Sequence, residues 1–276
     1  MARFACKKYT HPAPSSISCL IASPAKADLF RRTRDALRKL LIMRFEAVIF
    51  DLFGTLVNHF MSSVGQMHKE MAAVLAVPYE QFNPRWNQTT EMRVVGAFVT
   101  VEASIEYVLS EMNVDAQAEQ IKQAVAIRMG YIKKALRPKA HAISTLNQLK
   151  RHRYKTGLLS NCSVEIPLLW PETNFAGAID TPIFSCLAHL KKPDERIYHL
   201  ACEQLGTKPE SCLYIADGEE YELAAAARIG LQAVLIRSSS AESLGELHRE
   251  AREWRGPAIA TLPEVLALAG IETTRL

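Results

Sequence analysis

Two acids and a lysine carry the clearest chemical signal in this sequence, because the acids end apolar runs and the lysine opens a predicted helix. Asp51 follows the run AVIF, Asp217 follows CLYIA, and Lys192 directly precedes Pro193. A carboxylate beside a buried strand is unfavourable unless a metal ion, a lysine or backbone N–H groups compensate its charge. We therefore interpret Asp51 as a nucleophile or a metal ligand, with a role in capping the following turn as the alternative.

Hydroxyl and amide groups accompany these charged residues. Thr55 lies in the turn after Asp51, and Ser160 and Asn161 follow the run GLL. Such groups at the end of a strand suit an anionic oxygen, so we predict that these three bind substrate, although Ser-Asn is also common in turns and at helix starts. Pro193 favours an extended backbone at Lys192, whose charge can then face a phosphate or a carboxylate.

A parallel sheet would bring these residues together. Short β-branched runs alternate with helical patterns, which is typical of parallel strands covered on both faces, and ligands bind beyond the carboxyl ends of such strands. The sequence predicts strands over 45–50, 155–159, 178–184, 211–215 and 233–236. It predicts helices over 141–152, 194–205, 220–229 and 242–253. Pro193 is expected at the first position of its helix and Gly206 just beyond the last.

The stretch between the first two predicted strands shows helical periodicity and no strand signal. A β-α-β crossover needs far less chain, so we predict an all-helical cap inserted over residues 60–137 and closed by Pro138. Inserted lids exclude water and contact substrate. Within this cap, Arg93 is a candidate to bind a substrate carboxylate or phosphate, and a helix-surface Arg93 packed beside Trp86 is the alternative.

The composition excludes several classes of protein. The chain of 276 residues is 49% hydrophobic and 22% charged. It has no apolar stretch near the roughly 18 residues that a membrane span needs. Its six cysteines form no C-x-x-C pair, which indicates reduced thiols and a cytoplasmic protein. The excess positive charge lies in residues 1–44 and the rest is net acidic, so we expect no nucleic-acid partner and no membrane partner.

Residues 1–43 form a basic leader that is poor in acids and rich in Ser and Arg. We expect it to be poorly ordered or to form a short helix. Its composition suits an organelle transit peptide. We favour the alternative, an upstream start codon with Met43 as the first residue of the working protein.

Four segments are more specific together than any one of them: FDLFGTLV, LLSNCS, KKPDERIY and YIADGEEYEL, in this order. They resemble the four motifs of the haloacid dehalogenase-like hydrolase superfamily, and the resemblance covers nearly everything from about residue 44 to residue 240. The helical insert matches the subgroup whose cap follows the first motif. The resemblance implies a Rossmann-like core made of residues 44–59 and 138–276.

The resemblance also implies a role for each residue. Asp51 would be the nucleophile, Ser160 would bind the transferring group, and Lys192 would neutralise charge on both. Asp217 would complete a Mg²⁺ site with Asp51 and the main-chain carbonyl of Phe53, and oxygen ligands of this kind suit Mg²⁺. The implied reaction is displacement by Asp51 on a small anionic substrate, followed by hydrolysis of the covalent intermediate.

Phe53 departs from most phosphatases of this superfamily, which carry an Asp two residues after the nucleophile as general acid and base. With a poor leaving group, the absence of this second Asp would lower the rate of hydrolysis by about 10²- to 10⁴-fold. In the family's haloacid dehalogenases an aromatic residue stands there and no metal is used. Those enzymes commonly lack an acid at the position of Asp217, whereas this chain has Asp217 and also Glu222 at the family's second acidic position.

We therefore predict a Mg²⁺-dependent phosphatase for a small phosphorylated metabolite, with a metal-independent 2-haloacid dehalogenase as the alternative. In the phosphatase, His59, Glu219 or Glu220 would supply the missing acid, unless the substrate has a good leaving group. A degraded scaffold used for binding is a second alternative, but no structural requirement explains Asp51 and Lys192 there. We expect a monomer or a homodimer.

Overall fold

The structure is a computed structural model that describes residues 45–59, 61–237 and 249–272. The predicted leader over residues 1–43 and most of the predicted helix 242–253 therefore lie outside the described residues. Within the described part of the chain, we find no helix with the length and apolarity needed to cross a bilayer.

Six parallel strands form a single sheet in the order β3-β2-β1-β4-β5-β6. They are β1 (Ala47–Phe50), β2 (Lys155–Ser160), β3 (Thr181–Phe184), β4 (Cys212–Ala216), β5 (Gln232–Ile236) and β6 (Ala258–Ile259). The last residue of β1, Phe50, pairs with Leu158 of β2 and with Ile215 of β4. The ends of these three strands therefore meet at one edge, and the predicted parallel α/β sheet is confirmed.

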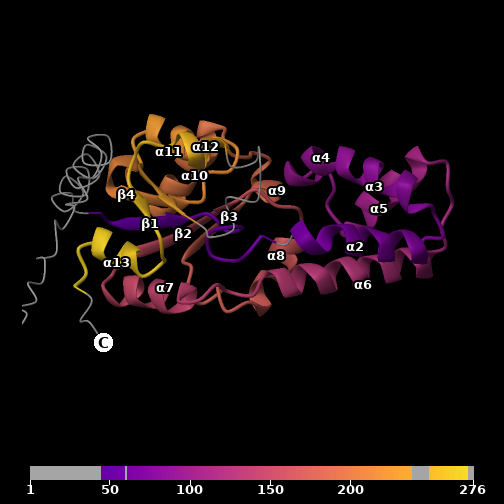
Figure 1. Cartoon of the computed structure of the whole chain (residues 1–276), viewed down its shortest axis with the longest axis horizontal. Coiled ribbons are helices and arrows are strands. Elements are labelled where there is room, and N and C mark those ends of the chain that lie inside the picture. Colours follow the sequence, from indigo (N-terminus) through magenta and orange to yellow (C-terminus); the bar gives the residue numbers. More distant parts are fainter. Residues whose placement is uncertain (1–44, 60, 238–248, 273–276) are drawn as a thin grey trace, which may run out of the picture.

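Helices cover both faces of the sheet (Figure 1). One face carries α10 (Glu195–Leu205), α11 (Glu222–Arg228) and α12 (Arg249–Glu253), and the other carries α7 (Ala142–Arg151) and α13 (Glu264–Leu268). The shorter connections include α8 (Glu165–Leu169), η1 (Trp170–Glu172), α9 (Ser185–Ala188) and η2 (Pro209–Ser211). Two separate clusters of buried apolar side chains fill the two faces, so the strands are apolar on both sides.

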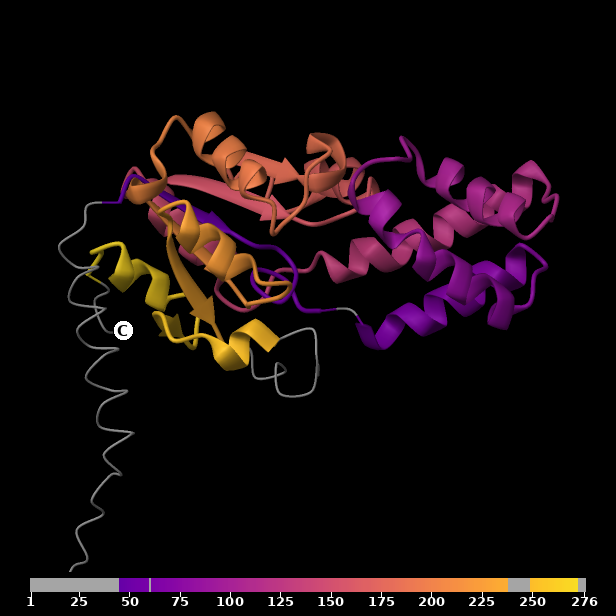
Figure 2. The ribbon, with the colours of Figure 1, turned by 90° about the horizontal axis from the view of Figure 1, so that it is seen from above.

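The chain between β1 and α7 forms a helical insert. It consists of α2 (Met61–Val74), α3 (Tyr79–Gln88), α4 (Thr90–Val94), α5 (Val101–Glu111) and α6 (Ala118–Ala135). These helices pack around their own buried cluster, which includes Met71, Trp86 and Ile105. The insert lies beyond the carboxyl ends of the strands, as Figures 1 and 2 show. Its two connections meet at a bridge between Val57 and Pro138, close to the predicted bounds, and its identity as a separate domain stays a prediction.

Three local predictions need correction. Pro193 does not occupy the first helical position, because α10 begins at Glu195 and the Asp194 side chain caps it by accepting the Arg196 N–H at 3.0 Å. Helix α11 begins two residues later than predicted, since Glu220 and Tyr221 have positive φ values of 52° and 61° that no α-helix accommodates. Strand β3 begins at Thr181 rather than at residue 178.

One other local prediction is confirmed. Gly206 follows the last turn of α10 with φ 61°, as predicted. Four cysteines are free and buried in the described chain: Cys162, Cys186, Cys202 and Cys212.

Candidate active site

Asp51 ends the central strand and points its carboxylate at a lysine. Its backbone N–H donates to the Ile215 carbonyl at 2.9 Å, which extends the sheet by one residue and fixes the position of Asp51. The residue is 6% exposed. Lys192 Nζ lies 2.6 Å from Asp51 Oδ1. The second oxygen, Oδ2, is buried and has no hydrogen-bond partner among the described residues.

Lys192 reaches Asp51 because Asn161 holds its backbone. The Asn161 Oδ1 accepts the Lys192 N–H at 2.8 Å, and the Asn161 Nδ2 donates to the Lys192 carbonyl at 3.0 Å. These two bonds join the loop after β2 to the loop before α10. The side chain of Lys192 also lies 2.5 Å from Glu222 Oε2, so one ammonium group bridges two carboxylates.

Three buried carboxylates converge beyond the ends of β1 and β4. Asp51, Asp217 and Glu222 each offer an oxygen within 4.8 Å of the others. Glu222 is the first residue of α11, and its Oε2 also accepts the Tyr214 hydroxyl at 2.6 Å. His59 Nε2 lies 2.7 Å from Asp217 Oδ2. Hard oxygen donors in this number and spacing fit Mg²⁺, which takes one or two protein carboxylates and fills its other positions with water and phosphate oxygens.

Gly54 allows the first motif to approach Asp217. Its φ is +79°, and a Cβ atom at this position would lie 1.9 Å from Asp217 Oδ2 and 2.2 Å from His59 Nε2. Any side chain there would displace both groups. Lys139, which follows the helical insert, donates to the Gly54 carbonyl and holds this turn from the opposite side.

The site carries more negative charge than its cations neutralise. Burial and the nearby Asp217 raise the pKa of Asp51, although Lys192 acts in the opposite direction. Burial likewise raises the pKa of Glu222 well above its usual range, against the effect of Lys192 and with the help of Asp51. Burial lowers the pKa of Lys192, but the charges of Asp51 and Glu222 outweigh it and hold that pKa well above its usual value. Lys192 is therefore charged.

Two further ionisable groups stand at the same end of the site. Burial and the charges of Asp217 and Asp51 raise the pKa of Glu219 to about 7. Burial acts to lower the pKa of His59. The hydrogen bond to Asp217 and the negative charge of Asp217 outweigh this effect, so the pKa of His59 is raised above its usual value. Glu219 and His59 are both among the residues that the sequence analysis proposes as the general acid in place of an Asp at residue 53.

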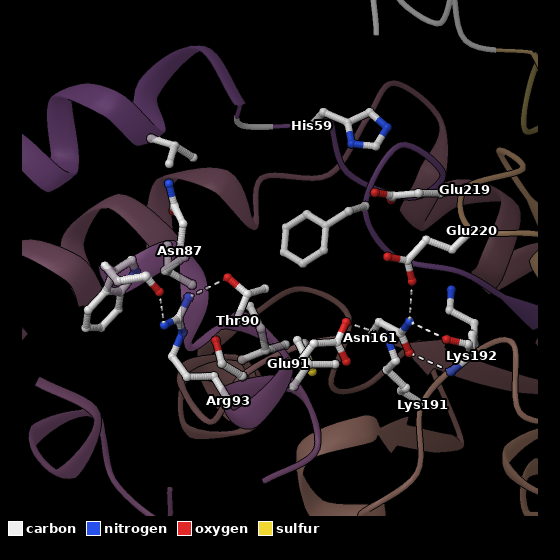
Figure 3. A pocket seen from close by; sticks show the side chains of 18 of the residues that line it. His59, Asn87, Thr90, Glu91, Arg93, Asn161, Lys191, Lys192, Glu219 and Glu220 are labelled. Carbon is white, nitrogen blue, oxygen red and sulfur yellow. Dashed lines mark hydrogen bonds and ion pairs between the residues drawn. The ribbon is translucent and has the colours of Figure 1, made fainter. Parts of the chain in front are cut away.

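A cavity of about 370 Å³ separates this carboxylate cluster from the helical insert. Figure 3 shows His59, Glu219, Glu220, Asn161 and Lys192 on the side of the sheet, and Asn87, Thr90 and Arg93 on the side of the insert. Asp51 and Phe53 also line the cavity. Phe53 therefore lines the cavity at the sequence position where most phosphatases of this superfamily carry a second Asp.

The cavity brings most of the predicted site residues together. Of the substrate-binding candidates, Asn161 and Arg93 line the cavity. Thr55 and Ser160 do not line it; they are fully buried beside it, and their hydroxyl oxygens have no hydrogen-bond partner among the described residues. The predicted roles of all these side chains, and of the Phe53 carbonyl, stay predictions.

Arg93 packs against Trp86, as one interpretation of the sequence expected, and also lines the cavity, as the substrate-binding interpretation requires. It lies against Trp86, with its guanidinium carbon 4.2 Å from the ring centroid. It is nevertheless 7% exposed and lines the cavity, so it is not a surface residue.

The sequence analysis did not identify several residues that shape the site, and it gave one of them, Glu222, little weight. Glu222 has an ordinary explanation at the start of a helix, and only the resemblance singled it out. Tyr214 lies inside β4, Lys139 follows the insert, and Arg128 and Glu165 belong to α6 and α8. These four come from distant parts of the chain and carry no local spacing signal, so sequence patterns alone had no means of finding them.

Comparisons with known proteins point to one hydrolase family. A family model described as haloacid dehalogenase-like hydrolase matches residues 45–230. The rhythmically expressed gene 2 protein of Drosophila melanogaster is 32% identical over 96 residues, which cover 34% of this chain and 37% of that protein. The (S)-2-haloacid dehalogenase 4A of Burkholderia cepacia is 22% identical over 204 residues, covering 71% of this chain and 84% of that protein.

A phosphatase is also among the similar proteins. The glyceraldehyde 3-phosphate phosphatase of Methanothermobacter thermautotrophicus is 27% identical over 139 residues, covering 49% of this chain and 59% of that protein. The chain thus spans 37% of the Drosophila protein and 59% of this phosphatase. A solved structure, a HAD phosphatase from Thermococcus onnurineus, has a TM-score of 0.58 at 19% identity and covers 83% of this chain and 99% of that chain. This likeness supports the α/β fold.

Proposed function

This chain belongs to the haloacid dehalogenase-like hydrolase family, and we infer that it is a Mg²⁺-dependent phosphatase acting on a small phosphorylated metabolite. One observation carries the inference: three buried carboxylates lie within 4.8 Å of one another, and among the described residues Lys192 bridges two of them while His59 contacts the third. Buried like charges at this spacing are unfavourable without a compensating cation. Glu222 also contacts Lys192 and Tyr214, whereas Asp217 stands at the position where the family's metal-independent dehalogenases commonly lack an acid.

In this proposal Asp51 attacks the phosphorus atom of the substrate. The Asp51–phosphorus bond forms as the bond to the leaving oxygen breaks, and water then hydrolyses the aspartyl-phosphate. Lys192 holds Asp51 in place and neutralises charge on it and on the transferring group. The buried hydroxyls of Thr55 and Ser160 would donate to phosphoryl oxygens. Asp51, Asp217 and the Phe53 carbonyl would hold the Mg²⁺, whose charge would reduce repulsion between the phosphoryl group and the attacking carboxylate.

The proton for the leaving group needs a donor other than residue 53. His59, Glu219 and Glu220 line the cavity that Asp51 also lines. Glu220 accepts a hydrogen bond from Asn161 at 3.3 Å. A substrate with a good leaving group, such as an acyl phosphate, would need none of the three.

The helical insert would act as a cap that excludes water and reads the leaving group. This role is supported by the insert residues Asn87, Thr90 and Arg93 in the wall of the cavity. We further propose a cytoplasmic monomer or homodimer that has neither a nucleic-acid nor a membrane partner.

A metal-independent 2-haloacid dehalogenase is the second candidate. Phe53 favours it, because an aromatic residue stands at this position in the family's dehalogenases. The Burkholderia dehalogenase, matched over 84% of its length, also favours it. In that reaction Asp51 would attack carbon and halide would leave without a proton.

Metal dependence separates the candidates. The purified chain is stripped with EDTA and assayed with p-nitrophenyl phosphate and with (S)-2-chloropropionate, each with and without Mg²⁺. The Asp51→Asn variant controls for contaminating enzymes. We expect phosphate release that Mg²⁺ restores. Chloride release without metal, or phosphate release that EDTA leaves intact, would contradict the phosphatase. An absence of turnover over a wide panel of phosphorylated metabolites and haloacids would favour a binding scaffold.

A further inference from the structure

Two guanidinium groups flank a tryptophan at the insert end of the cavity. The guanidinium carbon of Arg93 lies 4.2 Å from the Trp86 ring centroid, and that of Arg128 lies 4.8 Å from it. All three side chains line the cavity and are buried. Figure 3 shows Arg93 on the opposite side of the cavity from Lys192. The insert end of the cavity is therefore basic, whereas the sheet end is acidic.

Only one of the two arginines has a carboxylate partner in the described structure. Arg128 forms a buried ion pair with Glu165 and donates to Ser163 Oγ at 3.3 Å. Arg93 forms no ion pair with any described residue. His68, which also lines this end, adds no charge at neutral pH, because burial and the two arginines lower its pKa to about 4 despite a hydrogen bond to Asn83. Glu91 on the same helix also lines the cavity but pairs with Lys191 at 2.7 Å, so Arg93 contacts no carboxylate among the described residues.

Arg93 also keeps hydrogen-bonding capacity. Its Nη1 donates to the Trp86 carbonyl at 2.7 Å and to the Thr89 hydroxyl, and its Nη2 donates to the Thr90 hydroxyl at 3.0 Å. The Nε–H and the other Nη2–H have no hydrogen-bond partner among the described residues. The three bonds hold the guanidinium in place, so these remaining donors are fixed in orientation, which suits recognition of a planar anion.

The electrostatics favour an anion here. Burial, and secondarily the charge of Arg128, lower the pKa of Arg93 to about 9, although the charge of Glu165 acts in the opposite direction. A buried cation beside a like charge is destabilised, and a bound anion would relieve this. A single uncompensated positive charge matches a carboxylate better than a phosphate monoester, which carries between one and two negative charges near neutral pH.

We propose that Arg93 binds a carboxylate of the substrate, so that the substrate is a small phosphomonoester whose leaving group ends in a carboxylate. The proposal rests on the phosphatase function inferred above. The phosphoryl group would lie at the acidic end with Asp51 and the carboxylate at the basic end with Arg93. The cavity wall also includes the apolar side chains of Phe53, Val94 and Ile132, which suits a short carbon chain.

A pair of inert ligands tests the proposal on the unaltered chain. 3-Phosphonopropanoate and propylphosphonate have the same length and phosphonate, but only the first has a carboxylate. Both are titrated into the Mg²⁺-loaded protein by calorimetry. We expect 3-phosphonopropanoate to bind about 10- to 100-fold more tightly, the ratio that a charge-assisted hydrogen bond supports. Equal affinities would overturn the proposal. If propane-1,3-bisphosphonate binds more tightly than 3-phosphonopropanoate, Arg93 binds a second phosphate group, and the proposal of a substrate carboxylate is overturned.

Two variants locate the effect. Arg93→Gln removes the charge and is expected to reduce the ratio of affinities to near one, while Arg93→Lys restores part of it. Arg85→Gln is the matched control, because Arg85 lies on α3 outside the cavity and donates to the Gln81 carbonyl on its own helix. The control is expected to keep the full ratio. If Arg93→Gln keeps the full ratio of affinities for the two phosphonates, Arg93 does not bind the carboxylate.

The two proposals fail in different ways. A chain that shows the affinity ratio but hydrolyses no phosphomonoester would retain the carboxylate site and lose the phosphatase function. A chain that hydrolyses phosphomonoesters but binds both phosphonates equally would retain the phosphatase and lose the carboxylate site. Thermal melting of each variant confirms that it is folded before it is titrated.

Discussion

At the scale of single residues, Lys192 connects the proposed nucleophile Asp51 to a second buried carboxylate, Glu222. Its ammonium group lies 2.6 Å from Asp51 and 2.5 Å from Glu222, in a space where each of these side chains is nearly inaccessible to water. Charges so close and so buried interact strongly, and the loss of one leaves the others unpaired. Asp51 therefore depends on Lys192 for its orientation and for part of its charge balance.

Replacement of Asp51 tests the proposed nucleophile. Asp51→Asn keeps the size of the side chain but removes its nucleophilic charge, so we expect the rate of p-nitrophenyl phosphate hydrolysis to fall by about 10⁴-fold or more. The control is Asp194→Asn, since asparagine also caps a helix. Circular dichroism checks that both variants fold. A variant at residue 51 that retains a tenth of the rate would rule out this role.

Replacement of Gly54 tests the close approach of the first motif to Asp217. Gly54→Ala would place a Cβ atom 1.9 Å from Asp217 Oδ2 at a φ of +79°. We expect a loss of about 1–3 kcal/mol in the free energy of unfolding, measured by urea denaturation, together with weaker Mg²⁺ binding. Gly130→Ala is the control, because nothing lies within 4 Å of its Cβ and α6 favours alanine. Equal stability of the two variants would contradict the contact.

At the scale of elements, a histidine joins two helices of the insert. His68 of α2 lies 2.7 Å from Asn83 of α3 through Nδ1 and Asn83 Oδ1. It is 3% exposed. Burial, reinforced by the charges of Arg128 and Arg93, lowers its pKa from 6.5 to about 4 against the effect of the Asn83 hydrogen bond. The folded insert therefore keeps His68 neutral.

This histidine predicts a pH dependence of stability. Between pH 6.5 and about 4 the unfolded chain binds a proton at His68 that the folded chain does not, so stability falls as the pH falls through this window. From about pH 7.5 to about pH 5 the loss is about 2 kcal/mol. Urea denaturation of the unaltered chain and of His68→Gln at both values measures it. We expect the variant to lack this part of the loss. Parallel profiles would show that His68 titrates normally.

The elements differ in how well the sequence predicts them. The buried strands β1, β2, β4 and β5 were predicted because each is a β-branched or apolar run bounded by polar residues. The two-residue strand β6 and the short helix α13 were missed, since elements of this length carry too little periodicity. The start of α11 was misplaced because the left-handed backbone of Glu220 and Tyr221 has no signature in residues other than glycine and asparagine.

At the scale of the whole molecule, the site forms where four separate parts of the chain meet. Asp51 and Gly54 follow β1, Asn161 follows β2, Lys192 lies in the loop before α10, and Asp217 follows β4. The sequence predicts their convergence, because strand ends in a parallel sheet share an edge. Of the insert residues in the cavity wall it singles out only Arg93, because helical periodicity gives a buried face but not the neighbour that the face contacts.

A metal ion that bridges distant parts of the chain would stabilise the whole fold. We expect Mg²⁺ at about 100 times its dissociation constant to raise the free energy of unfolding by about 2.7 kcal/mol. Thermal melting with and without Mg²⁺ measures this. Asp217→Asn is expected to lose the effect, whereas Asp115→Asn, on the exposed connection before α6, keeps it. A melting temperature that ignores Mg²⁺ would contradict the proposed metal site.

The separate apolar clusters of the insert and the sheet have an evolutionary consequence. Residues that would read the leaving group lie on helices stabilised around Met71, Trp86 and Ile105, whereas Asp51 and Lys192 depend on the sheet. A mutation of a wall residue that packs in the insert cluster therefore leaves the strands that carry the nucleophile intact, whereas one at Ile132 acts on a cluster of the sheet. Duplicated genes for such a protein can diverge towards new metabolites by changes in one portion alone, and the reaction is inherited unchanged.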